Sequence, residues 1–251
     1  MNWHLGGARV YFGSQMEITP LGDSALMLHV RESFEDAPDE TLDEVLGYSD
    51  FLRRANLPAI TEVAPAYTTV AVFYDPARAV AAGADQKNIF EWMGGLVQTT
   101  IANGQVRLKR VKASPIEIPV CYDDTFALDL DDVTRCVGLS PEAVVDLHTS
   151  ALYRVSCLGF TPGFPYLSGL PRQLATPRRP VPRKEVAAGS VGIGGNQTGI
   201  YPIKSPGGWN IIGRTPMQLF NPKKNPPALL CPGDHVRFRI ISRDEFESWK
   251  R

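Results

Sequence analysis

AGSVGIGGNQTGIYP (Ala188–Pro202) runs directly into IKSPGGWNIIGRTP (Ile203–Pro216), and both stretches alternate short β-branched runs with glycines and prolines. Thirteen of the chain's 21 prolines lie between residues 162 and 232, and eight glycines lie between residues 189 and 213. Short apolar runs separated by turn residues are typical of an all-β barrel with tight turns. This region therefore predicts a mainly-β domain, and we expect no regular helix after Gly159.

The segment just upstream of the β-rich region mixes both periodicities. Ile116–Val120 predicts a strand, and two short helices should follow it, one from about Leu130 and one opened by Ser140-Pro141. Ser140 is able to cap free backbone amides, and proline fits the first helical position. We place the boundary between two domains near Gly104–Ser114.

The N-terminal half has a different texture. Residues 25–30 alternate with period two, residues 42–52 and 89–97 repeat apolar side chains at helical spacing, and residues 61–74 predict a pair of strands. The order strand, helix, strand, helix, strand indicates a small α+β sandwich of the ferredoxin-like type. The expected division is a flexible extension at residues 1–15, an α+β domain at residues 16–108 and a barrel domain at residues 109–251.

Composition limits the classes of function. The 251 residues are 43% hydrophobic and 21% charged, as in a globular protein, and the net charge of -1 predicts neither nucleic acid nor membrane as a partner. No apolar run approaches the roughly 18 residues of a membrane span, and the N-terminus lacks a secretion signal, so we expect a cytoplasmic protein. The four cysteines are widely spaced, which predicts reduced thiols and no metal site.

The glycine-rich segment Gly189–Pro202 is superficially similar to a nucleotide-binding loop. It lacks the GK[ST] of a P-loop, and Gln197 stands where a dinucleotide fingerprint has its third glycine. The glycines then indicate either close approach of backbones in a barrel or a loop whose amides contact an anion. The first interpretation is favoured.

A cluster of basic residues lies in a proline-stiffened stretch with no acidic residue among them. Fixed guanidinium groups suit carboxylate or phosphate, whereas a charge cluster is also typical of a solvated surface. The sequence leaves both interpretations open. The cluster comprises Arg172, Arg178, Arg179, Arg183 and Lys184.

Two further segments are candidates for chemistry. His148 shares the apolar edge of its predicted helix with Val144, which favours a partly buried, hydrogen-bonded histidine over a catalytic base near neutral pH. The loop Lys204–Trp209 places a serine beside a lysine, but adjacent residues of an extended segment point to opposite faces. A loop that contacts a ligand or another protein chain is the favoured interpretation.

Several long motifs occur in an order and spacing that resemble the family of 5-oxoprolinase B subunits, also known as allophanate hydrolase subunit 1. The resemblance covers nearly the whole chain after about residue 17. It implies an N-terminal α+β domain and a C-terminal cyclophilin-like β-barrel. The motifs are LGDSAL (Leu21–Leu26), PAYTTVAVFYDP (Pro65–Pro76), LGFTPGFPYLSGLP (Leu158–Pro171), LATPRRPVPR (Leu174–Arg183), AGSVGIGGNQTGIYP (Ala188–Pro202), SPGGWNIIGRTP (Ser205–Pro216) and CPGDHVRF (Cys231–Phe238).

The resemblance also implies a function. Members work with the A and C subunits of 5-oxoprolinase to open the lactam of 5-oxoproline to glutamate with ATP, and which of the three binds ATP is left open. The family includes an inhibitor of a sporulation histidine kinase, and related domains occur in urea carboxylase, so a regulatory binding module and a component of urea or allophanate metabolism are the alternatives. Val186-Ala187-Ala188 and Asn221 depart from the usual family pattern and affect loops only.

From the required chemistry we expect cations for carboxylate or phosphate and donors for a developing oxyanion. Arg178, Arg179 and Arg183 are the candidate cations, and His148 is the best candidate for a catalytic base. The remaining candidates for substrate binding are Gln197, Thr198, Tyr201, Ser205 and Arg214.

Overall fold

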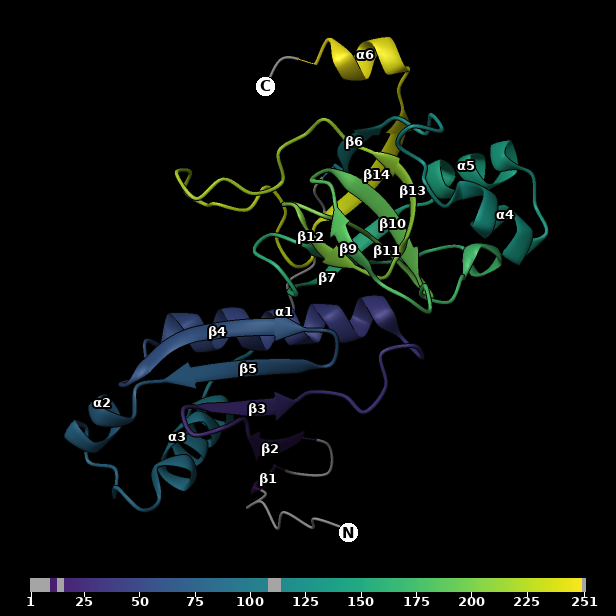
Figure 1. Cartoon of the computed structure of the whole chain (residues 1–251). Helices are drawn as coiled ribbons and strands as arrows, with labels where there is room; N and C mark the ends of the chain where they lie inside the picture. Colours follow the sequence, from purple (N-terminus) through teal and green to yellow (C-terminus); the bar gives the residue numbers. More distant parts are fainter. Residues whose placement is uncertain (1–9, 13–15, 108–113, 250–251) are drawn as a thin grey trace. The chain divides into compact units, whose positions relative to one another are not determined.

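The computed structural model describes residues 10–12, 16–107 and 114–249. The chain divides into two compact units, Met1–Arg110 and Val111–Arg251 (Figure 1). The domain bounds expected from the sequence, 16–108 and 109–251, remain predictions, because this division into compact units does not test them. Most of the predicted extension at residues 1–15 lies outside the described residues, and the part inside them, Val10–Phe12, is a short strand.

The first unit contains an antiparallel sheet with the strand order β1-β2-β3-β5-β4. Its strands are β1 (Val10–Phe12), β2 (Met16–Pro20), β3 (Ala25–His29), β4 (Ile60–Ala66) and β5 (Thr69–Tyr74), and its helices are α1 (Pro38–Ala55), α2 (Pro76–Ala81) and α3 (Ile89–Asn103). In β5 every second residue is buried, as a strand with one covered face requires. The buried side chains of α1 and α3 pack with those of the strands into one core.

The sequence predicted these elements well with one omission. The strands at residues 25–30 and 61–74 and the helices that end near Asn56 and Asn103 are confirmed. Helix α2 was missed although Asp75 caps it, accepting hydrogen bonds from the amides of Ala77 and Arg78, with Pro76 at the first helical position. An α+β unit is therefore present.

The ferredoxin-like description of this unit is not confirmed. In that fold a strand following the second helix completes the sheet. Here β3, α1, β4 and β5 follow the expected path, but the neighbour of β3 on its other side is β2, which precedes the first helix. The edge of the sheet is thus supplied from the N-terminal side.

The second unit is built on a seven-stranded sheet with the order β13-β10-β11-β8-β7-β14-β6, beside a small sheet of β9 and β12. Its strands are β6 (Ile116–Val120), β7 (Tyr153–Leu158), β8 (Pro165–Ser168), β9 (Arg183–Val186), β10 (Ser190–Gly194), β11 (Gln197–Ile200), β12 (Ser205–Gly207), β13 (Asn210–Arg214) and β14 (His235–Ile240), and its helices are α4 (Leu130–Val137), α5 (Pro141–Ser150), the 3₁₀ helix η1 (Arg172–Leu174) and α6 (Arg243–Glu247).

The two edges of the seven-stranded sheet meet and nearly close it. Cys121, just after β6, donates its amide to the carbonyl of Arg214 at the end of β13 (2.8 Å), and Arg214 donates back (2.9 Å). A single apolar core fills the interior, and α4 and α5 contribute Val133 and Val144 to it. This mainly-β, barrel-like sheet is consistent with the cyclophilin-like barrel that the resemblance implies.

The helices of the second unit confirm one prediction and correct another. α5 begins as expected, because the hydroxyl of Ser140 accepts from the amide of Ala143 (3.2 Å) and Pro141 follows. The expectation of no helix after Gly159 is wrong, since η1 and α6 lie there. Ser242 caps α6 by accepting from the amide of Glu245 (3.1 Å), so the Ser-x-x-Glu spacing was a readable start signal.

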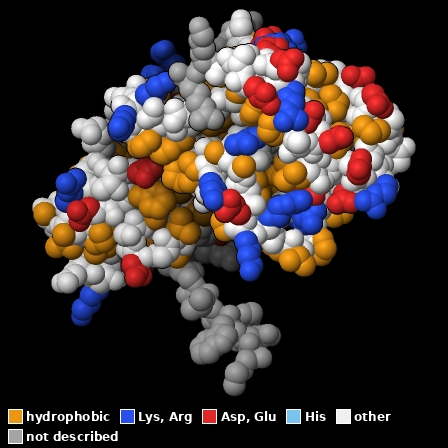
Figure 2. Space-filling model, turned by 45° about the horizontal axis from the view of Figure 1, so that its top comes forward, with side chains coloured by type: hydrophobic (Ala, Val, Ile, Leu, Met, Phe, Trp, Pro, Cys, Tyr) orange, Lys and Arg blue, Asp and Glu red, His pale blue; other side chains and the backbone are white. Residues whose placement is uncertain are grey.

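The surface agrees with the balanced composition. Figure 2 shows positive and negative side chains interspersed with apolar ones on the face it presents. Among the described residues, every helix is too short or too polar to span a bilayer.

Candidate functional site

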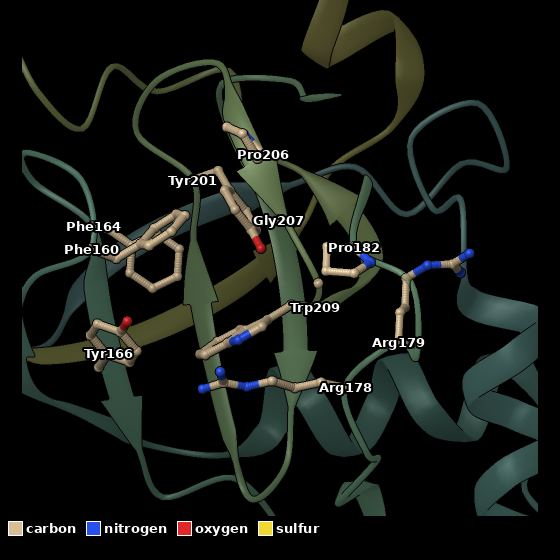
Figure 3. A pocket seen from close by; sticks show the side chains of 11 residues that line it. Phe160, Phe164, Tyr166, Arg178, Arg179, Pro182, Tyr201, Pro206, Gly207 and Trp209 are labelled. Carbon is tan, nitrogen blue, oxygen red and sulfur yellow. The ribbon is translucent and has the colours of Figure 1, made fainter. Parts of the chain in front are cut away.

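A pocket of about 280 Å³ lies in the second unit, and five of its eleven lining residues are aromatic (Figure 3). The loop before β8 and β8 itself supply one side, and the segment before β9 supplies basic residues. The residue after β11, strand β12 and the turn from β12 to β13 supply the rest. We call it the aromatic pocket; it is lined by Phe160, Phe164, Tyr166, Arg178, Arg179, Pro182, Tyr201, Pro206, Gly207, Gly208 and Trp209.

The aromatic side chains of the pocket hold one another in edge-to-face geometry. The ring of Phe164 lies 5.4 Å from that of Trp209 at 87° and 5.1 Å from that of Tyr201 at 83°. Tyr166 meets Trp209 at 5.8 Å and 73°. Such pairs are the preferred arrangement of aromatic quadrupoles, so the walls form a small core of their own and are preorganised.

Two glycines explain how these rings are accommodated. A Cβ on Gly194 would stand 2.7 Å from the indole of Trp209, and a Cβ on Gly207 would overlap the hydroxyl of Tyr201. Only glycine permits such close approach of a backbone to a ring. The glycines therefore permit close approach, as the favoured interpretation of the glycine-rich segment expects, although aromatic side chains and not only backbones approach them.

The candidate arginines separate into two groups. Arg179 forms an ion pair with Asp129, and Arg183 donates from both terminal nitrogens to the two oxygens of the same carboxylate at 2.7 Å. Arg178 is exposed, and its guanidinium carbon lies 5.8 Å from the ring centroid of Trp209. Neighbours in sequence thus have different electrostatic surroundings.

Asp129 is the centre of the paired group, and sequence reasoning missed it. Its side chain is 1% exposed and also accepts from the amide of Ile211 in β13 at 2.7 Å. A buried carboxylate is tolerable only when charges and donors compensate it, which two guanidinium groups and an amide do here. Nothing in the sequence distinguishes Asp129 from the nearby Asp131 and Asp132, which are exposed.

His148 lies in the barrel core, outside the aromatic pocket. It is fully buried, and its ring stacks on Phe238 at 4.5 Å. Burial lowers the pKa of His148 to about 3, so the imidazole is neutral at physiological pH. The structure therefore gives no support to the predicted catalytic base, because the ring does not reach a surface from which a substrate could deliver a proton.

Hydrogen bonds around His148 fix one tautomer. Thr198 is also fully buried and donates its hydroxyl proton to the carbonyl of Gly192 (3.0 Å), so it accepts from Nε2 of His148 (3.0 Å). Nδ1 is then unprotonated and accepts from the hydroxyl of Tyr122 (2.9 Å). Thr198, a predicted substrate contact, is a member of this internal chain.

The remaining predicted contacts are dispersed. Tyr201 lines the aromatic pocket, where burial raises the pKa of its hydroxyl, and Gln197 stands at the start of β11 outside the lining. Ser205 is buried in β12, and its hydroxyl has no hydrogen-bond partner within residues 114–249. Arg214 donates Nε to the carbonyl of Ala188 (2.9 Å) and lines a separate cavity of about 240 Å³.

The structure therefore brings together three of the predicted residues, Arg178, Arg179 and Tyr201, in one pocket. Sequence reasoning missed its aromatic wall as a site, although the motifs GFTPGFPY and PGGW carry most of these residues. In the described part of the chain, no group of three potential ligands is arranged to hold a metal ion.

The chain is a protein of two units, an α+β unit and a mainly-β barrel-like unit that contains the aromatic pocket. Comparison with known families identifies its family. The chain belongs to the family described as "Carboxyltransferase domain, subdomain C and D", which matches residues 16–230. Relatives named as the B subunit of 5-oxoprolinase also match this chain, which confirms the resemblance seen in the motifs.

Two of these relatives show the extent of the similarity. The 5-oxoprolinase B subunit of Bacillus subtilis (strain 168) is 38% identical over 240 residues, covering 93% of this chain and 96% of that protein. The 5-oxoprolinase B subunit of Escherichia coli O157:H7 is 58% identical over 123 residues, covering 49% of this chain and 56% of that protein.

Solved structures share the fold. TTHA0988 superposes with a TM-score of 0.71 at 37% identity, covering 87% of this chain, which spans 40% of that longer chain. The conserved uncharacterized protein PH0987 from Pyrococcus horikoshii gives 0.53 at 40% identity, covering 91% and 99% of the two chains. Urea carboxylase of Kluyveromyces lactis, at 20% identity, shares the fold alone (TM-score 0.70, 96% of this chain and 23% of that one).

Proposed function

We propose that this chain is one subunit of an ATP-dependent 5-oxoprolinase, which hydrolyses 5-oxo-L-proline to L-glutamate in the cytoplasm together with the A and C subunits. The observation that carries the proposal is the 38% identity to a 5-oxoprolinase B subunit across 93% of this chain and 96% of that protein. In this proposal the chain is inactive alone, and ATP is used by the assembled enzyme.

The chemistry of the reaction supports a binding role for the barrel unit. A five-membered lactam is stabilised by amide resonance, and coupling to ATP can convert its oxygen into a leaving group; such a route needs groups that hold a carboxylate and orient the ring. Arg178 and Tyr201 face the aromatic pocket and are retained in that role. Arg179 and Arg183 act on Asp129 instead, and we assign them to positioning the pocket wall.

The test is glutamate release from 5-oxoproline with ATP, measured with this chain alone, with the two presumed partners alone and with all three. Activity only in the full mixture supports the proposal. If the three folded proteins associate and release no glutamate, the proposal is wrong for this substrate, and a related amide such as allophanate should be tried next.

A second candidate is a binding module that docks on a sensor histidine kinase, and the exposure of apolar side chains at the pocket supports contact with another protein. Phe160 is 61% exposed at the pocket, and Val181, next to the lining residue Pro182, is 74% exposed. Exposed apolar side chains beside a preformed pocket are common at protein contacts. A regulator of this kind should bind the kinase by itself and need no small molecule. An enzyme subunit should instead show activity that depends on 5-oxoproline, ATP and its partner subunits.

A further inference from the structure

We propose that the aromatic pocket of this chain alone binds a small-ring monocarboxylate of the 5-oxoproline type, with Arg178 as the cation that anchors the carboxylate. The identity of the ring rests on the proposed function, and the class of anion rests on the geometry of the pocket.

The charge balance around the pocket singles out Arg178. Arg179 and Arg183 share the buried carboxylate of Asp129, and Arg179 also lies 3.5 Å from Asp132. Arg178 forms no ion pair with any residue in the described ranges, and its guanidinium lies over the indole of Trp209. A planar, weakly hydrated cation held against an aromatic face is suited to pair with a carboxylate.

The position of that cation is given by its place in the lining of the pocket, beside the ring of Trp209. Burial raises the pKa of Tyr166 and of Tyr201, and the charge of Arg178 is a smaller, opposing influence on both. Figure 3 shows Tyr166 and Phe164 on one side, Tyr201 and Trp209 across from them, and Arg178 alongside Trp209. The carboxylate of a bound ring is thus expected beside Arg178.

Size and wall chemistry fix the rest of the ligand. A volume of about 280 Å³ is just below the range of drug-sized sites, which begins at about 300 Å³, so the pocket suits a small ligand. The edges and faces of Phe164, Tyr166 and Trp209 suit the methylenes of a compact ring. A nucleotide carries several negative charges that one uncompensated guanidinium does not balance, so the pocket favours a monocarboxylate over ATP.

The experiment is a titration of the isolated full-length chain, followed by calorimetry and by tryptophan fluorescence. The probes are 5-oxo-L-proline and 2-pyrrolidinone, which has the same lactam ring without the carboxylate. Arg178→Ala is compared with Arg172→Ala, because Arg172 is also an exposed arginine of the same segment but lies outside the pocket lining. Trp209→Phe assigns the fluorescence change to the pocket.

We expect 5-oxo-L-proline to bind the wild-type chain and the Arg172→Ala variant alike, and Arg178→Ala to weaken binding by about 10- to 100-fold, as for loss of a charge-assisted hydrogen bond. 2-Pyrrolidinone should bind as weakly to the wild type as 5-oxo-L-proline binds to Arg178→Ala. The absence of binding up to about 10 mM, or equal affinity in both arginine variants, overturns the inference.

The outcome is separable from that of the proposed function. Turnover by the three-protein mixture without binding by the isolated chain removes the pocket inference and leaves the proposed role in the enzyme intact. Binding without turnover in any mixture leaves the pocket inference intact and removes the proposed reaction.

Discussion

Arginine has different roles in two regions of the barrel unit, the surroundings of Asp129 and the aromatic pocket. Arg178 and Arg179, adjacent in sequence, belong to different regions in this respect. On the Asp129 side, guanidinium groups compensate a carboxylate that is 1% exposed. On the pocket side, Arg178 lies exposed over Trp209. The difference shows that neighbouring basic residues need not share one function. The buried carboxylate of Asp129 pairs with Arg179 and Arg183, so Arg178 is the cation that remains available for a ligand.

The largest expected effect comes from removing the shared carboxylate. Asp129→Ala removes the buried carboxylate that two guanidinium groups share and should lower the free energy of unfolding by about 3–5 kcal/mol, as for breaking a buried ion pair. Chemical denaturation measures it. Asp131→Ala, at an exposed position in the first turn of α4, which Asp129 precedes, is the control and should change stability by about 0.5 kcal/mol or less. Equal effects of the two substitutions would falsify the central role of Asp129.

His148→Ala should cost about 2–4 kcal/mol, because it opens a cavity beside Phe238, removes the partner of the Tyr122 hydroxyl and removes one of the two partners of the buried Thr198 hydroxyl. The same denaturation experiment measures it. His235→Ala, at a partly buried position in β14, is the matched control and should cost less.

The low pKa of His148 also predicts a dependence of stability on pH. The pKa is 6.5 in the unfolded chain and about 3 in the folded one, so below pH 6.5 the unfolded state binds a proton that the native state does not. The contribution is present in full above pH 6.5 and declines toward pH 3 by up to about 1.4 kcal/mol per pH unit. His148→Ala should flatten this part of the profile; an unchanged slope contradicts the assignment.

A smaller effect is expected at Gly194, which packs against the pocket residue Trp209. Gly194→Ala pushes a methyl group into the indole of Trp209 and should cost about 1–3 kcal/mol, as other overpacked sites do. A change in tryptophan emission and in 5-oxoproline affinity should accompany the loss. Gly95→Ala in α3, where a Cβ meets open space, should produce neither effect.

The smallest effect on stability is expected at Arg178. Arg178→Ala removes an exposed side chain and should shift the free energy of unfolding by no more than about 0.5 kcal/mol, whereas Arg179→Ala should cost about 1.5–3 kcal/mol because it removes a charged hydrogen bond to Asp129. Thermal or chemical unfolding of the two variants side by side checks this. A larger loss at Arg178 than at Arg179 reverses the comparison.

Local signals in the sequence were sufficient for much of the fold. Ser140-Pro141 predicted α5, and turn residues at short intervals predicted the barrel, because caps and turns depend on neighbours along the chain. Helices α2 and α6 have equally local signals in Asp75-Pro76 and in Ser242 with Glu245, which make both helices predictable in principle.

The site was less predictable because it depends on distant contacts. Asp129 meets Arg179 and Arg183 across 50 and 54 positions of sequence, and no local pattern marks that carboxylate as buried. Thr198 and His148, 50 positions apart, form a hydrogen-bonded chain inside the core that spacing alone did not separate from a catalytic pair. The motif around Trp209 is visible in the sequence, but its aromatic partners Phe164 and Tyr166 come from β8 and the loop before it.

The most direct test of the division between these regions is the KM for 5-oxo-L-proline of the assembled three-component enzyme carrying Arg178→Ala, with Arg172→Ala as the reference. We expect a KM raised about 10-fold or more with an unchanged unfolding midpoint. An unchanged KM in an active, fully assembled Arg178→Ala enzyme would contradict it.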